Sequence, residues 1–326
     1  MNIFMTGGTG FIGGHLSQLF LKQGDKVTIA TRNPDRHAAS AQAQARNQEQ
    51  GQGQAKEQGQ DQRKSDNALV AFVPLDSDLS LHMKECNVVV NLAGETLFGK
   101  RWTGSVKKRL YNSRIQTTRS LVDAMRRLDK KPDVFLSASA VGYYGDCGSE
   151  IITEKRGAGN DFLARMCHDW EHEALKAESL GIRVVIPRTG VTLGREGGAL
   201  ATLLPVFKAF IGGSVGSGTQ YFPWIHIEDL CKSLVFAVRN EDFSGTFNAT
   251  APKPVTMNEF AKALGEVISR PSFFRVPEFA LDLVLGNDAA SMITNSHRAI
   301  PVKLHDNGFN FQYEDIGQAL RQILRS

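Results

Sequence analysis

The chain of 326 residues lacks the marks of several protein classes. Its four cysteines, Cys86, Cys147, Cys167 and Cys231, are scattered and form no C-x-x-C pair. This spacing argues against a disulfide framework and a zinc site, and it favours a reducing, cytoplasmic location. No stretch of about 18 apolar residues occurs, so no membrane span is predicted. The N-terminus has no basic segment with a cleavage site, so no signal peptide is predicted either.

The chain also lacks a concentration of charge of one sign. Its formal net charge is +4, but lysines and arginines are mixed with acids along most of its length. The one denser basic run extends from Lys100 to Arg114. We therefore expect no nucleic-acid partner. The expected partner is a small-molecule substrate, and a homodimer is left open.

A glycine-rich turn follows the first apolar run of the chain. Residues 3–5 predict a strand, and Leu16, Leu19 and Phe20 follow at the spacing of one buried helix face. A dinucleotide pyrophosphate needs a backbone without Cβ atoms close to it and free N–H groups at a helix N-terminus. The strand, turn and helix together therefore predict a dinucleotide site rather than an ordinary tight turn. Its candidate residues are Gly7, Gly8, Thr9, Gly10, Phe11, Ile12 and Gly13.

The second strand, predicted at residues 26–30, ends at Thr31 and Arg32. In such folds the cofactor lies beyond the carboxyl ends of the strands, so the residue there meets the adenosine ribose. An acid would accept the ribose 2′-hydroxyl, whereas Arg32 can pair with a 2′-phosphate through two hydrogen bonds. We therefore expect NADP(H) rather than NAD(H). The alternative is that Arg32 is an ordinary surface arginine.

Strands that alternate with helices predict an α/β fold with a doubly wound parallel (Rossmann) sheet and a smaller C-terminal lobe. We assign residues 1–194 to the NADP-binding domain and 195–326 mainly to the substrate-side lobe, with about 220–250 returning to the first domain. Residues 36–67 are rich in glutamine and have no apolar residue larger than alanine, so we expect a disordered insertion. The further predicted strands are 69–73, 88–90, 134–136, 184–188 and 246–250, and the predicted helices include 103–128, 161–180 and 203–210.

The predicted strand ends carry further candidates. Ala93 and Gly94 are small enough for a cofactor to lie against the backbone, and Arg114 is placed to reach its phosphates. After the fifth strand, hydroxyl-bearing residues are expected where a nicotinamide and a substrate meet. These are Ser137, Ser139, Tyr143 and Tyr144. The alternative is a loop whose tyrosines only pack.

The motifs NLAGE, SRIQTTRSLV, SASAVGYYG and GSGTQYFPWIHIEDL resemble those of the extended, epimerase-type short-chain dehydrogenase/reductases, in particular an atypical epimerase-like subgroup. The resemblance covers the chain except residues 36–67. It implies a Rossmann domain that binds NADP(H). It also implies that further residues lie along the cofactor in addition to those named above. These are Thr31, Leu92, Arg188, Val191 and Thr192.

One departure from this family concerns its acid/base pair. The family uses a Tyr-x-x-x-Lys motif, in which the phenol exchanges the proton and the ammonium lowers its pKa. None of the five tyrosines here has such a lysine, and Leu163 and Cys167 occupy the corresponding places. Ser139 matches the family's serine if one residue is inserted before Tyr144. Tyr143 or Tyr144 would then have to supply the proton.

Two function classes follow. The first is an NADP(H)-dependent oxidoreductase or epimerase-like enzyme acting on a small carbonyl or sugar-like substrate. The second is a non-catalytic NADP(H)-binding redox sensor or scaffold protein, favoured by the missing pair. Two further patterns are set aside: Gly212–Gly216 matches a hydrolase elbow without the required helix, and His168 and His172 lack a third metal ligand. We predict no metal site.

Overall fold

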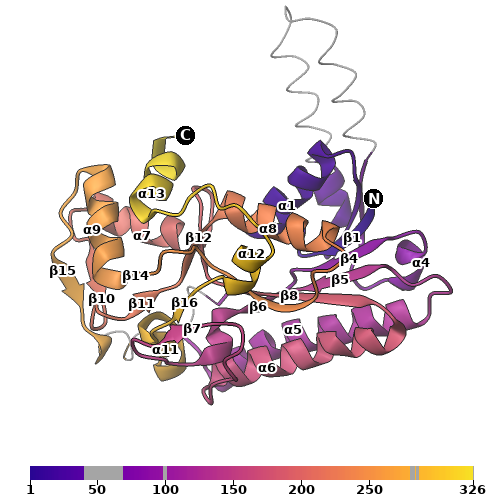
Figure 1. Cartoon of the computed structure of the whole chain (residues 1–326), viewed down its shortest axis with the longest axis horizontal. Coiled ribbons are helices and arrows are strands. Elements are labelled where there is room, and N and C mark those ends of the chain that lie inside the picture. The colour runs from indigo at the N-terminus through magenta and orange to yellow at the C-terminus, as the bar shows by residue number, and fades with distance from the viewer. Residues whose placement is uncertain (40–68, 98–100, 280–282, 284–285, 326) are drawn as a thin grey trace, which may run out of the picture. The chain divides into compact units, whose positions relative to one another are not determined.

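The computed structural model describes residues 1–39, 69–97, 101–279, 283 and 286–325 (Figure 1). Most of the predicted insertion, residues 36–67, lies outside the described residues. The chain divides into two compact units. The first contains Met1–Ala93, Thr117–Ser137 and Ala174–Val184, and the second contains Gly94–Gln116, Ala138–Glu173 and Val185–Ser326.

The first unit is built on a parallel sheet. Its strands are β1 (Asn2–Thr6), β2 (Lys26–Thr31), β3 (Val70–Pro74), β4 (Val88–Asn91) and β5 (Val134–Ser137). The start of β8 (Arg183–Thr189) joins them next to β5, and the hydrogen-bonded order is β8-β5-β4-β1-β2-β3. This is the strand order of the doubly wound dinucleotide-binding fold. The predicted fold class is therefore confirmed.

Apolar residues place β1 at the centre of this sheet. Met5 lies opposite Ile29 of β2 and Val90 of β4, and Val90 lies opposite Leu136 of β5. Ile3, Phe4 and Met5 are all buried. Parallel strands are covered on both faces, so they are apolar along their length rather than alternating. This explains why the short apolar runs in the sequence located these strands well.

Helices connect the parallel strands. The connections include α1 (Phe11–Lys22) after β1, α4 (Ser80–Met83) after β3, and α5 (Gly104–Arg126) after β4. Between β5 and β8 lie the short β6 (Ser139–Ala140), the 3-10 helix η1 (Val141–Tyr144), β7 (Ile151–Ile152), α6 (Phe162–Leu175) and the 3-10 helix η2 (Lys176–Leu180). On α1, Leu16 and Phe20 are fully buried, as their spacing predicts.

In the second unit, β8 continues between two short parallel neighbours. It pairs with β6 and with β13 (Gly245–Ala249), the predicted late strand. Four two-stranded pairs complete the unit: β9 (Val191–Leu193) with β12 (Trp224–His226), β10 (Gly213–Val215) with β15 (Phe274–Val276), β11 (Tyr221–Phe222) with β14 (Val255–Thr256), and β16 (Arg298–Ala299) with β7. Its later helices are α7 (Gly198–Lys208), α8 (Ile227–Arg239), α9 (Met257–Ile268), α11 (Asn287–Thr294), α12 (Val302–Asp306) and α13 (Ile316–Arg325).

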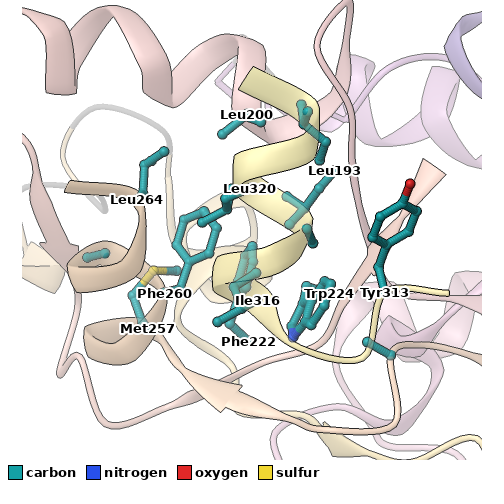
Figure 2. Packing of buried hydrophobic residues seen from close by; sticks show 14 of the residues in the cluster. Leu193, Leu200, Phe222, Trp224, Met257, Phe260, Leu264, Tyr313, Ile316 and Leu320 are labelled. Atoms are coloured by element: carbon teal, nitrogen blue, oxygen red, sulfur yellow. The ribbon is translucent and has the colours of Figure 1, made fainter. Parts of the chain in front are cut away.

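A hydrophobic core joins α9 and α13 in the second unit. Phe260 and Leu264 of α9 face Ile316 and Leu320 of α13, and Trp224 completes the core (Figure 2). All five side chains are buried. The helix α9 begins with the predicted capping box, in which the side chains of its N-cap threonine and third-position glutamate each bond the other's backbone N–H.

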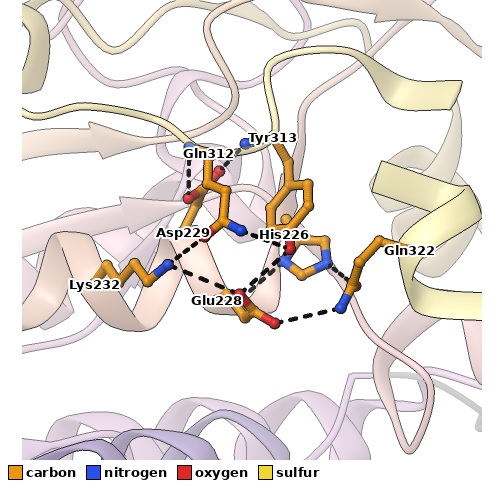
Figure 3. A network of polar contacts seen from close by, with 7 residues as sticks. All are labelled: His226, Glu228, Asp229, Lys232, Gln312, Tyr313 and Gln322. Atoms are coloured by element: carbon orange, nitrogen blue, oxygen red, sulfur yellow. Dashed lines mark hydrogen bonds and ion pairs between the residues drawn. The ribbon is translucent and has the colours of Figure 1, made fainter. Parts of the chain in front are cut away.

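A polar network fixes the last segment of the chain to the N-terminus of α8 (Figure 3). His226 Nδ1 accepts a hydrogen bond from the Glu228 backbone N–H, and its Nε2 lies 2.8 Å from Gln322 Oε1. Because Nδ1 is an acceptor, Nε2 must carry the proton. The Asp229 carboxylate accepts from the backbone N–H groups of Gln312 and Tyr313. The imidazole is therefore held as one neutral tautomer.

One predicted helix differs from the structure in its bounds. The helix predicted at residues 203–210 begins earlier, at Gly198. Ala199 and Leu200 of its first turn are buried, and this burial cannot be predicted from a sequence segment that is rich in glycine. The serine of the elbow-like Gly212–Gly216 pattern is Ser214, which is buried in the middle of β10. A nucleophile elbow needs an exposed serine between a strand and a helix, so this segment does not form one.

Candidate functional site

The glycine turn between β1 and α1 is closely packed. Gly7 has φ +74°, and a Cβ built on it would lie 2.5 Å from the Leu92 carbonyl carbon. A Cβ on Gly13 would lie 2.1 Å from the Gly7 carbonyl oxygen, and one on Gly8 would lie 2.9 Å from Ile29. Both Gly7 and Gly13 thus meet backbone atoms, which cannot give way as the end of a side chain does. This fixes the glycines at these positions by sterics.

The N-terminus of α1 carries no compensating negative charge. Its N-cap is Gly10, whose backbone N–H donates to the Gly7 carbonyl oxygen at 3.0 Å, and its first turn contains no acidic residue. Thr9 and Gly10 are exposed, whereas Phe11 and Ile12 are half-buried. The partial positive charge of the helix end is therefore available to an anion. A turn that glycine alone can fill, followed by such a helix end, fits the pyrophosphate of a dinucleotide.

The end of β2 presents a cation. Thr31 is buried at the last position of the strand, and Arg32, the next residue, is exposed. Asp25 lies at the opposite end of β2, where its carboxylate accepts a hydrogen bond from the N-terminal ammonium at 2.7 Å. No carboxylate therefore lies beside Arg32 on β2, and the chemistry of this strand end suits a phosphate rather than a ribose hydroxyl.

A buried amide organises the ends of β1, β4 and β5. Asn91 Oδ1 accepts from Thr6 Oγ1 at 2.8 Å, and Asn91 Nδ2 donates to Thr118 Oγ1 at 2.8 Å and to Ser137 Oγ at 3.2 Å. Ala93 N–H also donates to Asn91 Oδ1 at 3.3 Å. Ser137 is thus fully buried within this network. Asn91 was not among the predicted site residues, although a polar residue at the end of an apolar strand is a usable signal.

In the second unit, Arg114 of α5 lies along the backbone after β4. Its guanidinium donates to the carbonyl oxygens of Leu110 and Glu95, and it lies 5.3 Å from the centre of the Trp170 ring. A Cβ on Gly94 would lie 3.1 Å from the guanidinium carbon. Burial lowers the pKa of Arg114 below its ordinary value, against the opposing charge of Glu95. Gly94 and Arg114, which were predicted separately as cofactor residues, are therefore close neighbours.

The centre of the second unit is a buried ion pair. Arg188 at the end of β8 donates through Nε and Nη2 to the two carboxylate oxygens of Glu171, at 2.9 and 2.8 Å. Ser139 Oγ donates to Glu171 Oε1 at 2.6 Å. Burial alone lowers the pKa of Arg188, but hydrogen bonding to Glu171 and its charge raise it well above its ordinary value. Ser139 and Arg188 thus share one carboxylate.

Both candidate tyrosines contact the same guanidinium. The Tyr143 ring centre lies 3.5 Å from the Arg188 guanidinium carbon, a close cation–π contact, and Tyr143 is half-buried. Tyr144 is fully buried; its hydroxyl donates to Asn248 Oδ1 at 2.6 Å and accepts from Arg188 Nη1 at 3.0 Å. Burial raises the pKa of Tyr144 to about 12, against the opposing charge of Arg188. Of the two phenols, Tyr143 is the more open to a ligand.

Leu163 and Cys167, which the resemblance assigns to the places of the Tyr-x-x-x-Lys pair, are on α6. Leu163 and Cys167 are buried there, and Glu171 follows one turn later. Burial and the charge of Glu171 raise the pKa of the Cys167 thiol to about 12. A thiol this weakly acidic stays protonated at neutral pH, so it replaces neither the phenol nor the ammonium. Glu171, which follows Cys167 at the same i, i+4 spacing, is the ionic group of this face.

The remaining predicted cofactor residues lie in β9. Val191 is half-buried and pairs with Trp224, whereas Thr192 is buried and pairs with Ile225. The turn before them is tight, because a Cβ on Gly190 would lie 2.2 Å from the Pro223 carbonyl oxygen.

Two negative observations concern the described residues alone. Within them, no three His, Cys, Asp or Glu side chains converge to hold a metal ion, and no helix combines the length and apolarity needed to cross a membrane.

The strand order and the glycine turn define a nicotinamide-dinucleotide-binding Rossmann protein. The model of the NAD dependent epimerase/dehydratase family matches residues 3–249, and the chain belongs to this family. A second family model, a domain of unknown function termed DUF1731, matches residues 276–323. The family assignment agrees with the resemblance seen in the sequence motifs.

Three known proteins are similar over nearly the whole chain. A chloroplastic SDR39U1 homologue from Arabidopsis thaliana is 36% identical, with 100% of this chain and 87% of the relative covered. The epimerase family protein YfhF of Bacillus subtilis is 36% identical, with 99% and 98% covered. The crystal structure of the human epimerase family protein SDR39U1 with NADPH is 29% identical, with a TM-score of 0.83 and 100% and 99% covered.

Proposed function

We propose that this protein binds NADP(H) and acts as an oxidoreductase or epimerase-like enzyme on a small carbonyl or sugar-like substrate. The observation that carries the proposal is the glycine turn, whose Gly7 and Gly13 leave no room for a Cβ and lead into a helix end without acidic residues. The choice of NADP(H) is supported by Arg32 and by the human relative, which was crystallised with NADPH.

Within this proposal, residues of the first unit hold the phosphates. The backbone from Gly8 to Ile12 receives the pyrophosphate, and Arg32 pairs with the 2′-phosphate. Thr31, Leu92 and Ala93 line the adjoining backbone. Gly94, Arg114, Arg188, Val191 and Thr192 are the cofactor residues proposed from the second unit. The bound dinucleotide supplies a hydride donor or acceptor.

The proposed role of the substrate-side residues is to orient the substrate and move a proton. Tyr143 is the proposed proton donor, because its ring is held by Arg188 and its side chain is only half-buried. Ser139 and Tyr144 support it indirectly, since their hydroxyls bond Glu171, Asn248 and Arg188. A substrate hydroxyl or carbonyl beside Tyr143 would then exchange a proton with the phenol.

A second candidate function is a non-catalytic NADP(H)-binding redox sensor or scaffold. This function is favoured by two hydrogen bonds that engage candidate hydroxyl groups, from Ser139 to Glu171 and from Tyr144 to Asn248. The high pKa of the Cys167 thiol also favours it. All three side chains are buried, as is typical of residues that stabilise the fold rather than react. Four free, buried cysteines support a reducing cytoplasmic setting for either function.

Turnover distinguishes the two candidates. The wild type, Tyr143→Phe and Tyr144→Phe are loaded with NADPH, and loss of its absorbance at 340 nm is followed with a panel of aldehydes, ketones and nucleotide sugars. The enzyme proposal expects oxidation with at least one compound and about 100-fold slower oxidation by Tyr143→Phe at unchanged NADPH affinity. If NADPH binds but no compound oxidises it, the non-catalytic function replaces the enzyme.

A further inference from the structure

His297 is a buried polar side chain that the proposed function has not used. It is 5% exposed, and its Nε2 is buried with no hydrogen-bond partner among the described residues. Leaving a buried polar atom unpaired costs about 1–3 kcal/mol, so such an atom in a native fold needs an explanation.

A loose segment is not that explanation, because the backbone around His297 is fixed on both sides. The His297 N–H donates to the Tyr221 carbonyl oxygen at 3.1 Å. The preceding Ser296 donates its N–H to Asp146 Oδ1 at 2.9 Å, and its Oγ accepts from the Tyr221 N–H at 2.9 Å. The following Arg298 and Ala299 pair with β7. The backbone that carries the imidazole is therefore fixed, while Nε2 has no partner among the described residues.

The segment that carries His297 packs against the segment that carries the tyrosines. The Asp161 carboxylate accepts from Asn295 Nδ2 at 2.9 Å, and a Cβ on Gly145 would lie 3.5 Å from it. Gly145 directly follows Tyr144, and Ala299 packs in one cluster with Tyr143 and Tyr144. The segment Asn295–Ala299 thus lies against the turn that carries the proposed proton donor.

Two carboxylates define what the imidazole can bind. Asp161 and Asp146 both act electrostatically on His297 and favour its charged form, yet burial prevails and lowers its pKa to about 4. At neutral pH the ring therefore offers one N–H and one lone pair without net charge. The same carboxylates disfavour an anionic group beside it. A neutral hydroxyl or carbonyl oxygen is the matching ligand chemistry.

We propose that His297 is a substrate-binding residue, whose imidazole hydrogen-bonds a hydroxyl or carbonyl oxygen of a small, locally uncharged substrate. This rests on the proposed enzyme function and names the chemistry of its substrate. The unpaired Nε2 is then satisfied only in the complex, and the free protein carries the cost of leaving it unpaired.

The test compares His297→Phe, His297→Gln and the control His305→Phe, whose native side chain is 85% exposed. Each NADPH-loaded protein is titrated, by thermal shift and by NADPH oxidation, with D-glyceraldehyde, dihydroxyacetone and a library of neutral sugars. The anionic comparison compounds are glyoxylate and pyruvate. The full chain and saturating NADPH are used throughout.

The proposal expects His297→Phe to melt at or above the wild-type temperature, because an unsatisfied polar group has been removed. It also expects the apparent affinity for the binding neutral compound to fall about tenfold, with unchanged NADPH affinity. His297→Gln, which retains a polar group near the position of Nε2, should recover part of this loss, and His305→Phe should behave as wild type. A merely structural histidine predicts a lower melting temperature and no selective loss.

The outcomes separate this inference from the proposed function. Binding of a neutral compound that His297→Phe weakens, without NADPH oxidation, supports the role of His297 and contradicts the enzyme. Oxidation of NADPH that is equal in wild type and His297→Phe supports the enzyme and overturns the role of His297. Stabilisation by none of the neutral compounds, or preference for the anionic ones, also overturns it.

Discussion

Glu171 and Arg188 form two hydrogen bonds, of 2.9 and 2.8 Å, between side chains that are each 5% exposed. Glu171 is on α6, and Arg188 lies near the end of β8. Ser139, Tyr143 and Tyr144 all contact one member of this ion pair. The ion pair therefore helps to hold all three hydroxyl-bearing side chains in place.

Removal of one partner of this pair should destabilise the fold strongly. Glu171→Ala leaves the Arg188 guanidinium buried and without its carboxylate, which costs about 3–5 kcal/mol in the free energy of unfolding. The matched control is Glu178→Ala, an exposed acid in η2, expected to change stability by less than about 0.5 kcal/mol. Urea unfolding measures both. A loss below about 1 kcal/mol for Glu171→Ala would mean that the pair is open to water.

Two neighbouring glycines of α1 should respond oppositely to alanine. In Gly13→Ala the new Cβ would approach the Gly7 carbonyl oxygen, so the turn must open, and both stability and NADPH affinity should fall, the affinity by at least about tenfold. In Gly14→Ala the Cβ meets nothing within 4 Å, so helix propensity alone acts and the protein should gain about 0.5–1 kcal/mol. Titration with NADPH and thermal unfolding test the pair; equal behaviour contradicts the packing of the turn.

Stability should decrease on acidification through two buried histidines. Burial lowers the pKa of His226, and lowers that of His297 to about 4, below the ordinary value of 6.5. The unfolded chain therefore binds more protons, and these contributions are complete above pH 6.5 and are lost as the pH falls through the folded values. For His297 the loss is about 1.4 kcal/mol per pH unit between 6.5 and 4.

The check on this prediction is a series of urea unfolding curves from pH 7.5 to 4.5. His297→Gln should show a shallower decline than wild type, because its side chain does not titrate. In His226, protonation of Nδ1 would remove the acceptor for the Glu228 N–H, so His226→Gln should also decline less steeply. Parallel curves for all three proteins would contradict the buried, neutral state of these rings.

The two tyrosines should differ in what their hydroxyl groups do. Tyr144→Phe leaves Asn248 Oδ1 without its bond from the phenol, so the protein should lose about 1–3 kcal/mol of stability. Tyr143→Phe keeps the ring against Arg188 and should alter stability by less than about 0.5 kcal/mol while slowing NADPH oxidation. Differential scanning calorimetry beside the turnover assay compares them. The opposite result, in which Tyr144→Phe slows NADPH oxidation and Tyr143→Phe lowers stability, would make Tyr144 the proton donor.

The sequence predicts the first unit better than the second for a physical reason. Parallel strands are buried on both faces, so runs such as Val88–Val90 are visible as apolar segments, and Gly13 is fixed by contacts with Gly7 and Gly8 inside one local motif. The spacing of these glycines therefore carries the prediction of a dinucleotide site, although the Cβ excluded at Gly7 would meet Leu92, which is distant in the sequence.

The second unit depends on contacts between distant residues. Nothing local indicates that Ser139 bonds Glu171, that Tyr144 bonds Asn248, or that His297 has a buried, unpaired Nε2. The early start of α7 was not predicted for the same reason. Burial of Leu200 in the folded protein stabilises the first helical turn more than the low helix propensity of the preceding glycines destabilises it. Pattern reasoning finds groups that a single motif positions, whereas these groups are positioned by the assembled fold.

The central claim is NADP(H) binding with Arg32 as the residue that selects the 2′-phosphate. Calorimetric titration of wild type and Arg32→Ala with NADPH and with NADH tests it most directly. We expect one NADPH per chain, bound at least about tenfold more tightly than NADH, a difference of about 1.4 kcal/mol that Arg32→Ala largely removes. Equal affinities of the wild type for the two cofactors, or binding of neither, would contradict the account.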